Sequence, residues 1–333
     1  MKKFLSLILV MLTILSMLAS CGLNDKKEKE EQAKDAKDAY TRNGEKIIFG
    51  SYPQSEVTDE ALKAQLNSKA GELPTADNSQ AWSKNDYMWY IDVEEGEEKY
   101  RGVYFTAYRY CSTWSNSSAE VYQRENGYLT GNVYWFKYEP ISWSISSENE
   151  DDGTAVLICD SLLDSQPLST SGVVDYSESS LRKWLNETFY NTAFSKDQKN
   201  IIITTAPDKV QDFSGVEEDM IADLKAVKDK VFVQLPPYDV KFTEVEGFLM
   251  DKKATKYALS QGVSVIDKST GICDYCTYWG GVTVRSNVWA WDFEVSSGMS
   301  HDEMVQEANR MYNELVANTT SGGIIPVLKI KLK

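Results

Sequence analysis

The chain has 333 residues, of which 42% are hydrophobic, so it holds ample material for a buried core. It carries 35 Lys and Arg against 50 Asp and Glu, which gives a formal charge of −15 at pH 7. A domain this acidic repels polyanions, so the composition argues against nucleic acid as a partner.

The first 20 residues are typical of a secretory signal peptide. The basic pair Lys2-Lys3 precedes an apolar run from Phe4 to Leu18. The run of about 15 residues is shorter than the roughly 20 needed to span a bilayer. Cys21 follows Leu18-Ala19-Ser20, as in the bacterial lipobox, where the thiol receives two fatty acyl chains such as palmitate. An ordinary signal peptide with a chance cysteine is the alternative, but we expect lipid attachment at Cys21.

Residues 21–44 are expected to form a charged, flexible tether. Lys26–Glu31 and the repeat over Ala33–Asp38 contain almost no apolar bulk, so this segment cannot offset the entropy cost of ordering. Two acyl chains are enough for stable anchoring, which predicts a protein held on the extracytoplasmic face of the cell membrane. Loss of Lys2 and Lys3 would leave 33 basic and 50 acidic side chains, a charge of −17. We find no Pro/Gly/Ser linker further on and expect a single domain over 45–333.

This domain is expected to consist mainly of short strands. Aromatic and β-branched runs predict strands over Lys46–Tyr52, Tyr100–Tyr110, Val133–Tyr138, Ile141–Ser146, Ala155–Ile158, Ile201–Ile203, Val231–Val233 and Val282–Arg285. Pro140 suits only an edge or a bend between two of them. The polar stretch Glu148–Gly153 predicts a hairpin turn, and we expect its oxygens to be solvated rather than bound to calcium. At the end of the chain, Leu328, Ile330 and Leu332 alternate with lysines, which indicates a half-buried strand.

Helices are indicated at a few places between these strands. Leu181, Trp184, Leu185 and Phe189 recur at helical spacing, as do Met304, Ala308, Met311 and Leu315 after a capping box of Ser300 and Glu303. Weaker patterns predict helices over Thr58–Asn67, Gly215–Val227 and Thr255–Ser260. Because strands and helices do not alternate regularly, the fold class is expected to be α+β.

Three blocks of the chain resemble an uncharacterised domain family of exported proteins from Gram-positive bacteria. They are Phe49–Ser55, Val133–Ile141 and Ser180–Phe194, and the resemblance extends from about Lys46 to the C-terminus. Val282–Ser286 and Gly323–Leu328 depart from the family's pattern, and the second block lacks its arginine. The family itself resembles the C-type-lectin-like fold of sulfatase-modifying enzymes. This resemblance implies mixed antiparallel sheets with inserted helices, in which the N- and C-terminal strands pair.

The cysteines and the histidine give little support to catalysis or metal binding. Cys111 and Cys159 can form a disulfide, and so can Cys273 and Cys276, but spacing does not establish either bridge. Cys273 and Cys276 lie in a loop context rather than at the helix N-terminus typical of redox pairs. His301 is the single histidine, which removes most zinc-site designs. We expect no metal, no cofactor and no catalytic residue of the Ser-His-Asp type.

An aromatic cluster near the C-terminal end is the predicted ligand-binding site. Its members are Tyr278, Trp279, Arg285, Trp289 and Trp291, and flat aromatic faces stack well on sugars or peptides. The sequence therefore predicts a membrane-anchored binding or surface-interaction module, with a glycan or a surface protein as its ligand. The alternative is an extracytoplasmic enzyme, either a cysteine oxidase similar to sulfatase-modifying enzymes or a carboxylate glycoside hydrolase.

Overall fold

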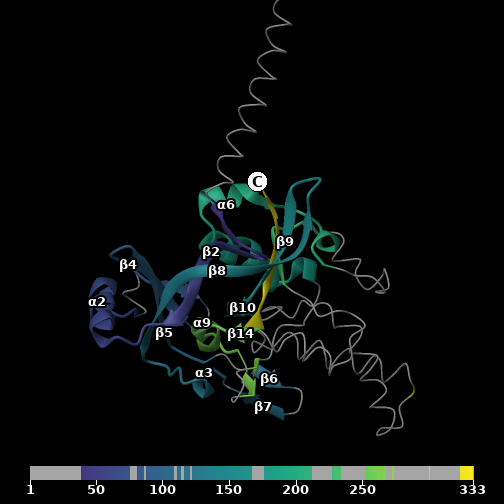
Figure 1. Ribbon diagram of the computed structural model, residues 1–333. Helices are drawn as coiled ribbons and strands as arrows, with labels where there is room; N and C mark the ends of the chain where they lie inside the picture. The colour runs from purple at the N-terminus through teal and green to yellow at the C-terminus, as the bar shows by residue number, and fades with distance from the viewer. Residues whose placement is uncertain are drawn as a thin grey trace, which may run out of the picture.

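The computed structural model describes residues 39–75, 81–85, 88–108, 111–113, 116–120, 122–166, 176–211, 227–233, 252–263, 265–267, 272–273, 300 and 323–332. Its main feature is an antiparallel sheet of ten described strands, in which β12, β18, β9, β8, β5, β4 and β3 each pair with the next in this order, and β1, β2 and β13 pair with members of this path (Figure 1). These strands are β1 (Thr41–Asn43), β2 (Lys46–Glu56), β3 (Ser83–Asn85), β4 (Met88–Glu95), β5 (Glu98–Phe105), β8 (Val133–Asn149), β9 (Thr154–Cys159), β12 (Ile202–Ile203), β13 (Val231–Val233) and β18 (Pro326–Lys331).

Short strands and helices complete the described part. The strands pair as β10 (Ser161–Leu162), β14 (Lys253–Ala254), β16 (Ile272–Cys273) and β15 (Val265–Asp267); β11 (Asp164–Ser165) with β17 (Gly323–Ile324); and β6 (Cys111–Thr113) with β7 (Asn116–Glu120). The helices are α2 (Glu60–Ala70), α3 (Tyr122–Glu125), η1 (Tyr176–Glu178), α4 (Ser180–Lys183), η2 (Trp184–Phe189), α5 (Tyr190–Ala193), α6 (Lys196–Ile201), η3 (Pro207–Lys209) and α9 (Lys256–Ser260). Since helices and antiparallel strands mix without regular alternation, the α+β class holds.

The long strand β8 is the centre of the sheet. Trp143 pairs with both Ile47 of β2 and Cys159 of β9, and Phe136 pairs with both Glu56 of β2 and Arg101 of β5. Strands β5 and β9 therefore lie end to end along one edge of β8, and β2 lies along the other. Two separate strands were expected here, and the structure corrects this to one.

Pro140 explains why one strand is possible at this place. It lies between the stretch of β8 that pairs with β5 (133–137) and the stretch that pairs with β9 (143–149). On that edge of β8 no described strand pairs with Pro140, and on the other edge Pro140 pairs with Ser51 of β2 next to a register shift. The ladder is therefore irregular at the one residue that lacks an N–H.

The expected pairing of the first and last strands is wrong. β2 pairs with β1 and β8, whereas β18 pairs with β9, β12 and β13. The two strands belong to the same sheet but β8 and β9 separate them. Their amphipathic patterns predicted two strands correctly, but such patterns carry no information on which strands become neighbours.

The main core lies between one face of the sheet and the helices that follow the hairpin of β8 and β9. Ile47, Phe49 and Trp143 of the sheet pack with Leu181 and Leu185 of the helical segment 180–193. Gly50 is required at this contact, because its φ is +77° and an added Cβ would lie 2.7 Å from the ring of Phe194. The indole N–H of Trp143 donates to the Phe49 carbonyl at 2.7 Å, which satisfies this buried donor.

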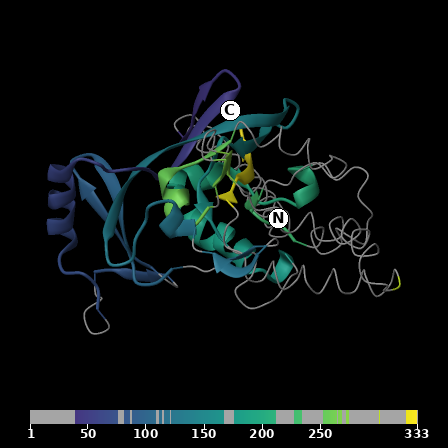
Figure 2. The ribbon, with the colours of Figure 1, turned by 90° about the horizontal axis from the view of Figure 1, so that it is seen from below.

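A second, aromatic core lies on the opposite face of the β3–β4–β5–β8 part of the sheet. Helix α2 covers it at one end of the molecule, as Figures 1 and 2 both show. The helix begins after the cap Asp59, whose carboxylate accepts from the Leu62 N–H at 2.7 Å, and ends at Gly71. The Trp135 indole N–H donates to Asn67 Oδ1 at 2.8 Å, so the central tryptophan of this core is fixed to the helix.

Other predicted elements are confirmed where the structure describes them. The helix over 180–193, the hairpin of β8 and β9, α9 and β13 lie where they were expected, and β18 buries Leu328 and Ile330. Ile201 is the last residue of α6 rather than part of a strand. The expected helices over Gly215–Val227 and after Ser300, and the strand over Val282–Arg285, lie outside the described residues.

Candidate functional site

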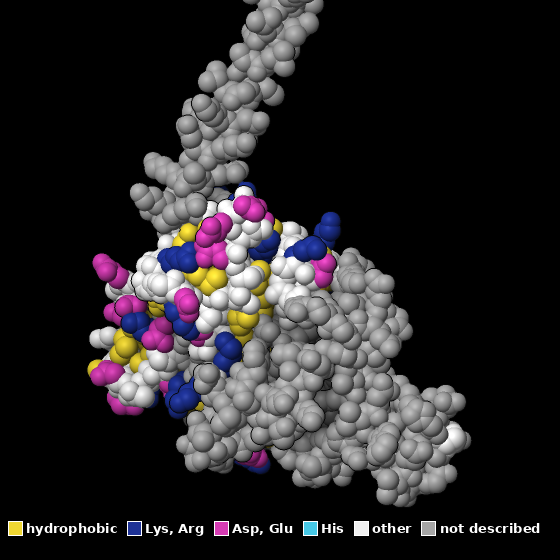
Figure 3. All heavy atoms as spheres, turned by 45° about the vertical axis from the view of Figure 1, so that its right-hand side comes forward, with side chains coloured by type: hydrophobic (Ala, Val, Ile, Leu, Met, Phe, Trp, Pro, Cys, Tyr) yellow, Lys and Arg dark blue, Asp and Glu magenta, His cyan; other side chains and the backbone are white. Residues whose placement is uncertain are grey.

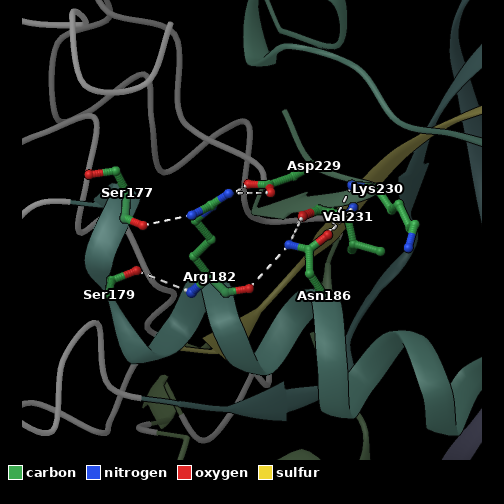
Figure 4. A network of polar contacts seen from close by, with 7 residues as sticks. All are labelled: Ser177, Ser179, Arg182, Asn186, Asp229, Lys230 and Val231. Carbon is green, nitrogen blue, oxygen red and sulfur yellow. Dashed lines mark hydrogen bonds and ion pairs between the residues drawn. The ribbon is translucent and has the colours of Figure 1, made fainter. Parts of the chain in front are cut away.

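The most developed polar site of the described chain surrounds Arg182 at the start of the helical segment 180–193 (Figure 4). Ser179 caps this segment: its Oγ accepts from the Arg182 N–H at 3.1 Å. The Arg182 guanidinium donates from Nε and Nη2 to the two carboxylate oxygens of Asp229, at 2.8 and 2.9 Å. Its Nη1 donates to the Ser177 carbonyl at 2.7 Å. Asp229 is only 5% exposed and the Arg182 side chain is 31% exposed, so the carboxylate of this bidentate ion pair is shielded from solvent while the guanidinium reaches the surface.

Asn186 extends the same network by one helical turn. Its Nδ2 donates to the carbonyls of Arg182 and Val231, both at 3.1 Å. Its Oδ1 accepts from the N–H groups of Lys230 and Val231, at 2.9 and 3.1 Å. Asn186 therefore uses all of its hydrogen-bonding capacity to join the helical segment to the residues that lead into β13.

The helical geometry changes where Asn186 lies. The Tyr190 N–H donates to the Leu185 carbonyl five residues back, so the residues of η2 form a π-helical turn. Asn186 supplies a side-chain donor to the Arg182 carbonyl within this altered ladder. Leu181, Leu185 and Phe189, spaced four residues apart, are all buried on one face of the segment.

A hollow of about 450 Å³ lies over this network. It is lined by residues of the helical segment, the turn before it and the facing strand: Ser177, Glu178, Ser179, Ser180, Arg182, Lys183, Asn186, Glu187 and Asp229. Acidic and basic groups occur together in this lining, and Ser179 and Asp229 are its buried members. On the face of the molecule drawn in Figure 3, the described acidic and basic side chains are likewise interspersed. The hollow therefore has no strong preference for a ligand of one charge.

A second polar network lies on the inner face of the sheet, around Arg101 of β5. The side chain of Arg101 is 8% exposed and donates from Nε and Nη2 to the carboxylate of Asp92, at 2.8 and 3.0 Å. The Tyr138 hydroxyl donates to the same carboxylate at 2.9 Å, and the rings of Tyr90 and Tyr138 flank the guanidinium. Burial acts to raise the pKa of Asp92, but the hydrogen bonds and charge of Arg101 outweigh it, so the net pKa is lowered. This ion pair is a structural element of the sheet.

A buried tyrosine links β2 to β11. The Tyr52 hydroxyl donates to Asp164 Oδ2 at 2.7 Å, and the Ser165 N–H donates to the other carboxylate oxygen at 2.7 Å. Burial and the neighbouring Asp164 raise the pKa of Tyr52 well above its usual value, so the phenol stays protonated and acts as a donor.

A third charged cluster lies where β2, β8 and the end of β9 meet. Ser142 and Ser144 each donate from Oγ to the Asp160 carboxylate at 2.6 Å, and Lys46 Nζ lies 2.7 Å from Asp160 and 2.9 Å from Ser144 Oγ. A Ser–Lys catalytic pair requires a neutral, desolvated amine. Lys46 is about half exposed and held in an ion pair with Asp160, so it is not the desolvated amine that such a pair needs, and it serves the fold.

The structure corrects one disulfide that the sequence left open. Cys159 is a free, buried thiol, so it forms no bridge with Cys111. Burial raises its pKa to about 12, which keeps the sulfur protonated and unreactive at neutral pH. The side chains of Cys273 and Cys276 lie outside the described residues, and the proposed bridge between them stays a prediction.

The predicted ligand-binding residues Tyr278, Trp279, Arg285, Trp289 and Trp291 lie outside the described residues, as does the lipid-attachment residue Cys21. In the part of the chain that is described, no group of three His, Cys, Asp or Glu side chains has the arrangement of a metal site. Within the same part, no helix has the length and apolar character required to span a membrane.

The sequence pointed to the helix around Arg182 but not to the role of its polar residues. The serines before the helix and the apolar spacing were recognised, whereas Asp229 and Arg101 were not singled out. Asp229 lies 47 residues from Arg182 along the chain, so no local pattern connects the two. Arg101 lies in a strand rich in aromatic residues, and this position could have indicated a buried arginine with an acidic partner.

The fold and these networks define an α+β domain in which charged side chains hold the sheet and helices together. Residues 152–331 match the family described as Domain of unknown function (DUF6273), and since this is more than half of the chain, the protein belongs to that family. No curated protein and no solved structure matches the chain.

The matched region begins at the tip of the hairpin between β8 and β9. It contains the helical segment 180–193 and β18, and it leaves out the expected blocks Phe49–Ser55 and Val133–Ile141. The expectation of an uncharacterised domain family is confirmed, although the match begins later than Lys46. The strands before residue 152 nevertheless belong to the same sheet as β9 and β18.

Proposed function

We propose that this protein is an exported lipoprotein, anchored through Cys21 to the extracytoplasmic face of the cell membrane, whose domain is a binding module for a glycan or another surface protein. The observation that carries the anchor is the order of basic pair, apolar run and small residues directly before Cys21. The first described residue, Ala39, is buried in the main core and Thr41–Asn43 form β1 of the sheet. The folded domain therefore begins before the expected boundary at residue 44, and the proposed tether covers at most residues 21–38.

The chemistry of the described domain supports binding over catalysis. Arg182 and Asp229, Arg101 and Asp92, and Lys46 and Asp160 form ion pairs with direct hydrogen bonds. Charged groups held in this way stabilise a rigid scaffold, which suits a module that recognises a ligand without transforming it. The alternative of a cysteine oxidase would need two converging thiols other than Cys159, because that thiol is buried and protonated.

A C-type-lectin-like fold and a Gram-positive origin belong to the same proposal and rest on the sequence blocks alone. The separation of β2 from β18 removes one of the arguments for this fold, since paired terminal strands were its expected signature.

Mass spectrometry of the native protein tests the anchor. We expect the N-terminal peptide to begin at Cys21 with a diacylglyceryl group, and the Cys21→Ser variant to leave the membrane fraction. A native chain that still begins with Met1, or that starts at an unmodified Cys21 and is found outside the membrane fraction, would contradict the proposal.

Glycan and peptide arrays probed with the detergent-solubilised mature protein test the binding function. We expect at least one glycan or peptide class to bind in a saturable way, and an excess of the same free compound to displace it. Absence of saturable binding to every class on both arrays, with the fold intact by circular dichroism, would overturn the proposed binding function while leaving the anchor in place.

A further inference from the structure

A row of side chains crosses the sheet on the face that carries the aromatic core. Lys84 of β3, Trp89 of β4, Tyr104 of β5 and Val133 of β8 are direct partners in successive strand pairs. We call these four residues the aromatic row. Neighbouring strands are about 4.8 Å apart, so the row extends over roughly 14 Å.

The aromatic row lies beside the part of the aromatic core that is buried. The next residues on this face, Trp82 and Trp135, are at most 5% exposed, and Leu66 and Ala70 of α2 pack in the same core. Trp89, Tyr104 and Val133 are only partly buried against that core. The sheet therefore has one continuous aromatic face. Helix α2 covers the buried part of this face, and the aromatic row lies at the edge of the covered part.

Two observations show that the rings of the row face solvent. The exposed ammonium of Lys84 lies 5.6 Å from the centre of the Trp89 ring, and an ammonium of this kind stays hydrated. Within the described part of the chain, neither the Trp89 indole N–H nor the Tyr104 hydroxyl forms a hydrogen bond, and neither atom is buried, unlike the unpaired indole nitrogen of Trp82. The row thus offers aromatic faces together with unused donors at their rims.

We propose that the aromatic row is a binding site for a neutral glycan, in which a sugar ring stacks on Trp89 and Tyr104 and Lys84 hydrogen-bonds a hydroxyl or acetamido oxygen. This inference rests on the proposed function and assigns it a ligand class and a second location, separate from the expected cluster around Trp289.

The size and charge of the row select this ligand. A fully buried aromatic side chain contributes about 150–250 Å², so two partly buried rings offer far less than the roughly 800 Å² that each partner buries in a stable protein complex. A short sugar chain needs only such a small, flat surface with apolar faces and polar rims. The acidic surface of the chain, with its formal charge of −15, repels polyanionic glycans and leaves neutral ones.

Hydroxyl-radical footprinting of the full-length protein in detergent tests the site directly. Cellohexaose, chitohexaose and maltohexaose serve as probes at millimolar concentration. With at least one of them, we expect oxidation of Trp89 and Tyr104 to fall about threefold or more. Oxidation of Trp184, a partly buried tryptophan of the helical segment, should stay unchanged. If Trp89 and Tyr104 resist oxidation in the free protein, they are not accessible and the inference is wrong.

Affinity measurements on matched variants complete the test. Trp89→Ala should weaken binding of that probe about tenfold or more, which corresponds to about 1.4 kcal/mol. Tyr104→Phe keeps the ring and should cost less, and Trp184→Ala is the control. Binding that survives Trp89→Ala in a folded variant would overturn this site but not the binding function. Binding of none of the three probes would overturn the inference, while a ligand found on the arrays would still uphold the proposed function.

Discussion

Asn186 offers the sharpest test of how the helical segment is fixed to the sheet. Asn186→Ala removes four hydrogen bonds, two to carbonyls and two from N–H groups. Each such bond contributes about 0.5–1.5 kcal/mol, and the backbone groups of Lys230 and Val231 would lose a partly buried partner. We expect the free energy of unfolding to fall by about 2–4 kcal/mol, a large part of the roughly 5–15 kcal/mol typical of a domain.

Thermal and urea denaturation followed by circular dichroism measure this change. The midpoint should fall by roughly 2–4 °C for each kcal/mol. Asn191→Ala is the matched control on the same helical segment, because Asn191 is exposed and only accepts a hydrogen bond from Lys199 at 2.9 Å. It should cost less than about 0.5 kcal/mol. If the two variants are equally stable, Asn186 does not hold the segment to β13 and the reasoning fails.

Three further predictions concern the sheet. Gly50→Ala should lower the free energy of unfolding, measured in urea, by about 2–4 kcal/mol, because the backbone φ is positive and the new Cβ would meet the ring of Phe194. Gly96→Ala is the control: its φ is also positive but its Cβ would meet open space, so it should cost about 1 kcal/mol. Equal costs for the two variants would contradict the packing argument. Burial acts to raise the pKa of Asp160, but Lys46 and two serines outweigh burial, so the folded pKa lies below the unfolded one. The carboxylate of Asp160 therefore stabilises the fold above about pH 4, the unfolded pKa, and this stabilisation is lost as the pH falls through the folded pKa. Lys46→Met should reduce stability at pH 7 by less than about 1 kcal/mol and flatten the acid limb of the pH profile, and an unchanged limb would show that the pair is not formed. A fragment of residues 152–333 should show no cooperative thermal transition in calorimetry, since it lacks β2 and β8; a sharp transition would show that the matched region folds alone.

Local patterns in the sequence predicted several of the longer elements, among them β5, β9, β18 and the helical segment 180–193, but not β4 or α6. The spacing of Leu181, Leu185 and Phe189 located the helical segment, and alternation located β18. These patterns report which face of an element is buried, and the core residues of both elements are buried as expected.

The sequence could not predict contacts between distant residues. Nothing local to Arg182 identifies Asp229 as its partner, and nothing in β2 or β18 excludes their pairing. Pro140 predicted a bend because proline interrupts most strands, but a strand with partners that end on either side of it tolerates proline. The π-helical turn at η2 was also not predicted, because the spacing of Leu181, Leu185 and Phe189 fits an ordinary α-helix.

The described chain enters and leaves the fold at the same end. The Gln198 side-chain amide of α6 donates to the Ala39 carbonyl at 3.2 Å, and Ile202, directly after α6, pairs with Ile330 of β18 (Figure 1). A reporter fused behind β18 would therefore lie near the point where the described chain enters the fold, whereas α2 lies at one side of the domain, away from that point (Figure 1). An epitope inserted after Gly71, at the end of α2, would thus be held away from the proposed membrane anchor.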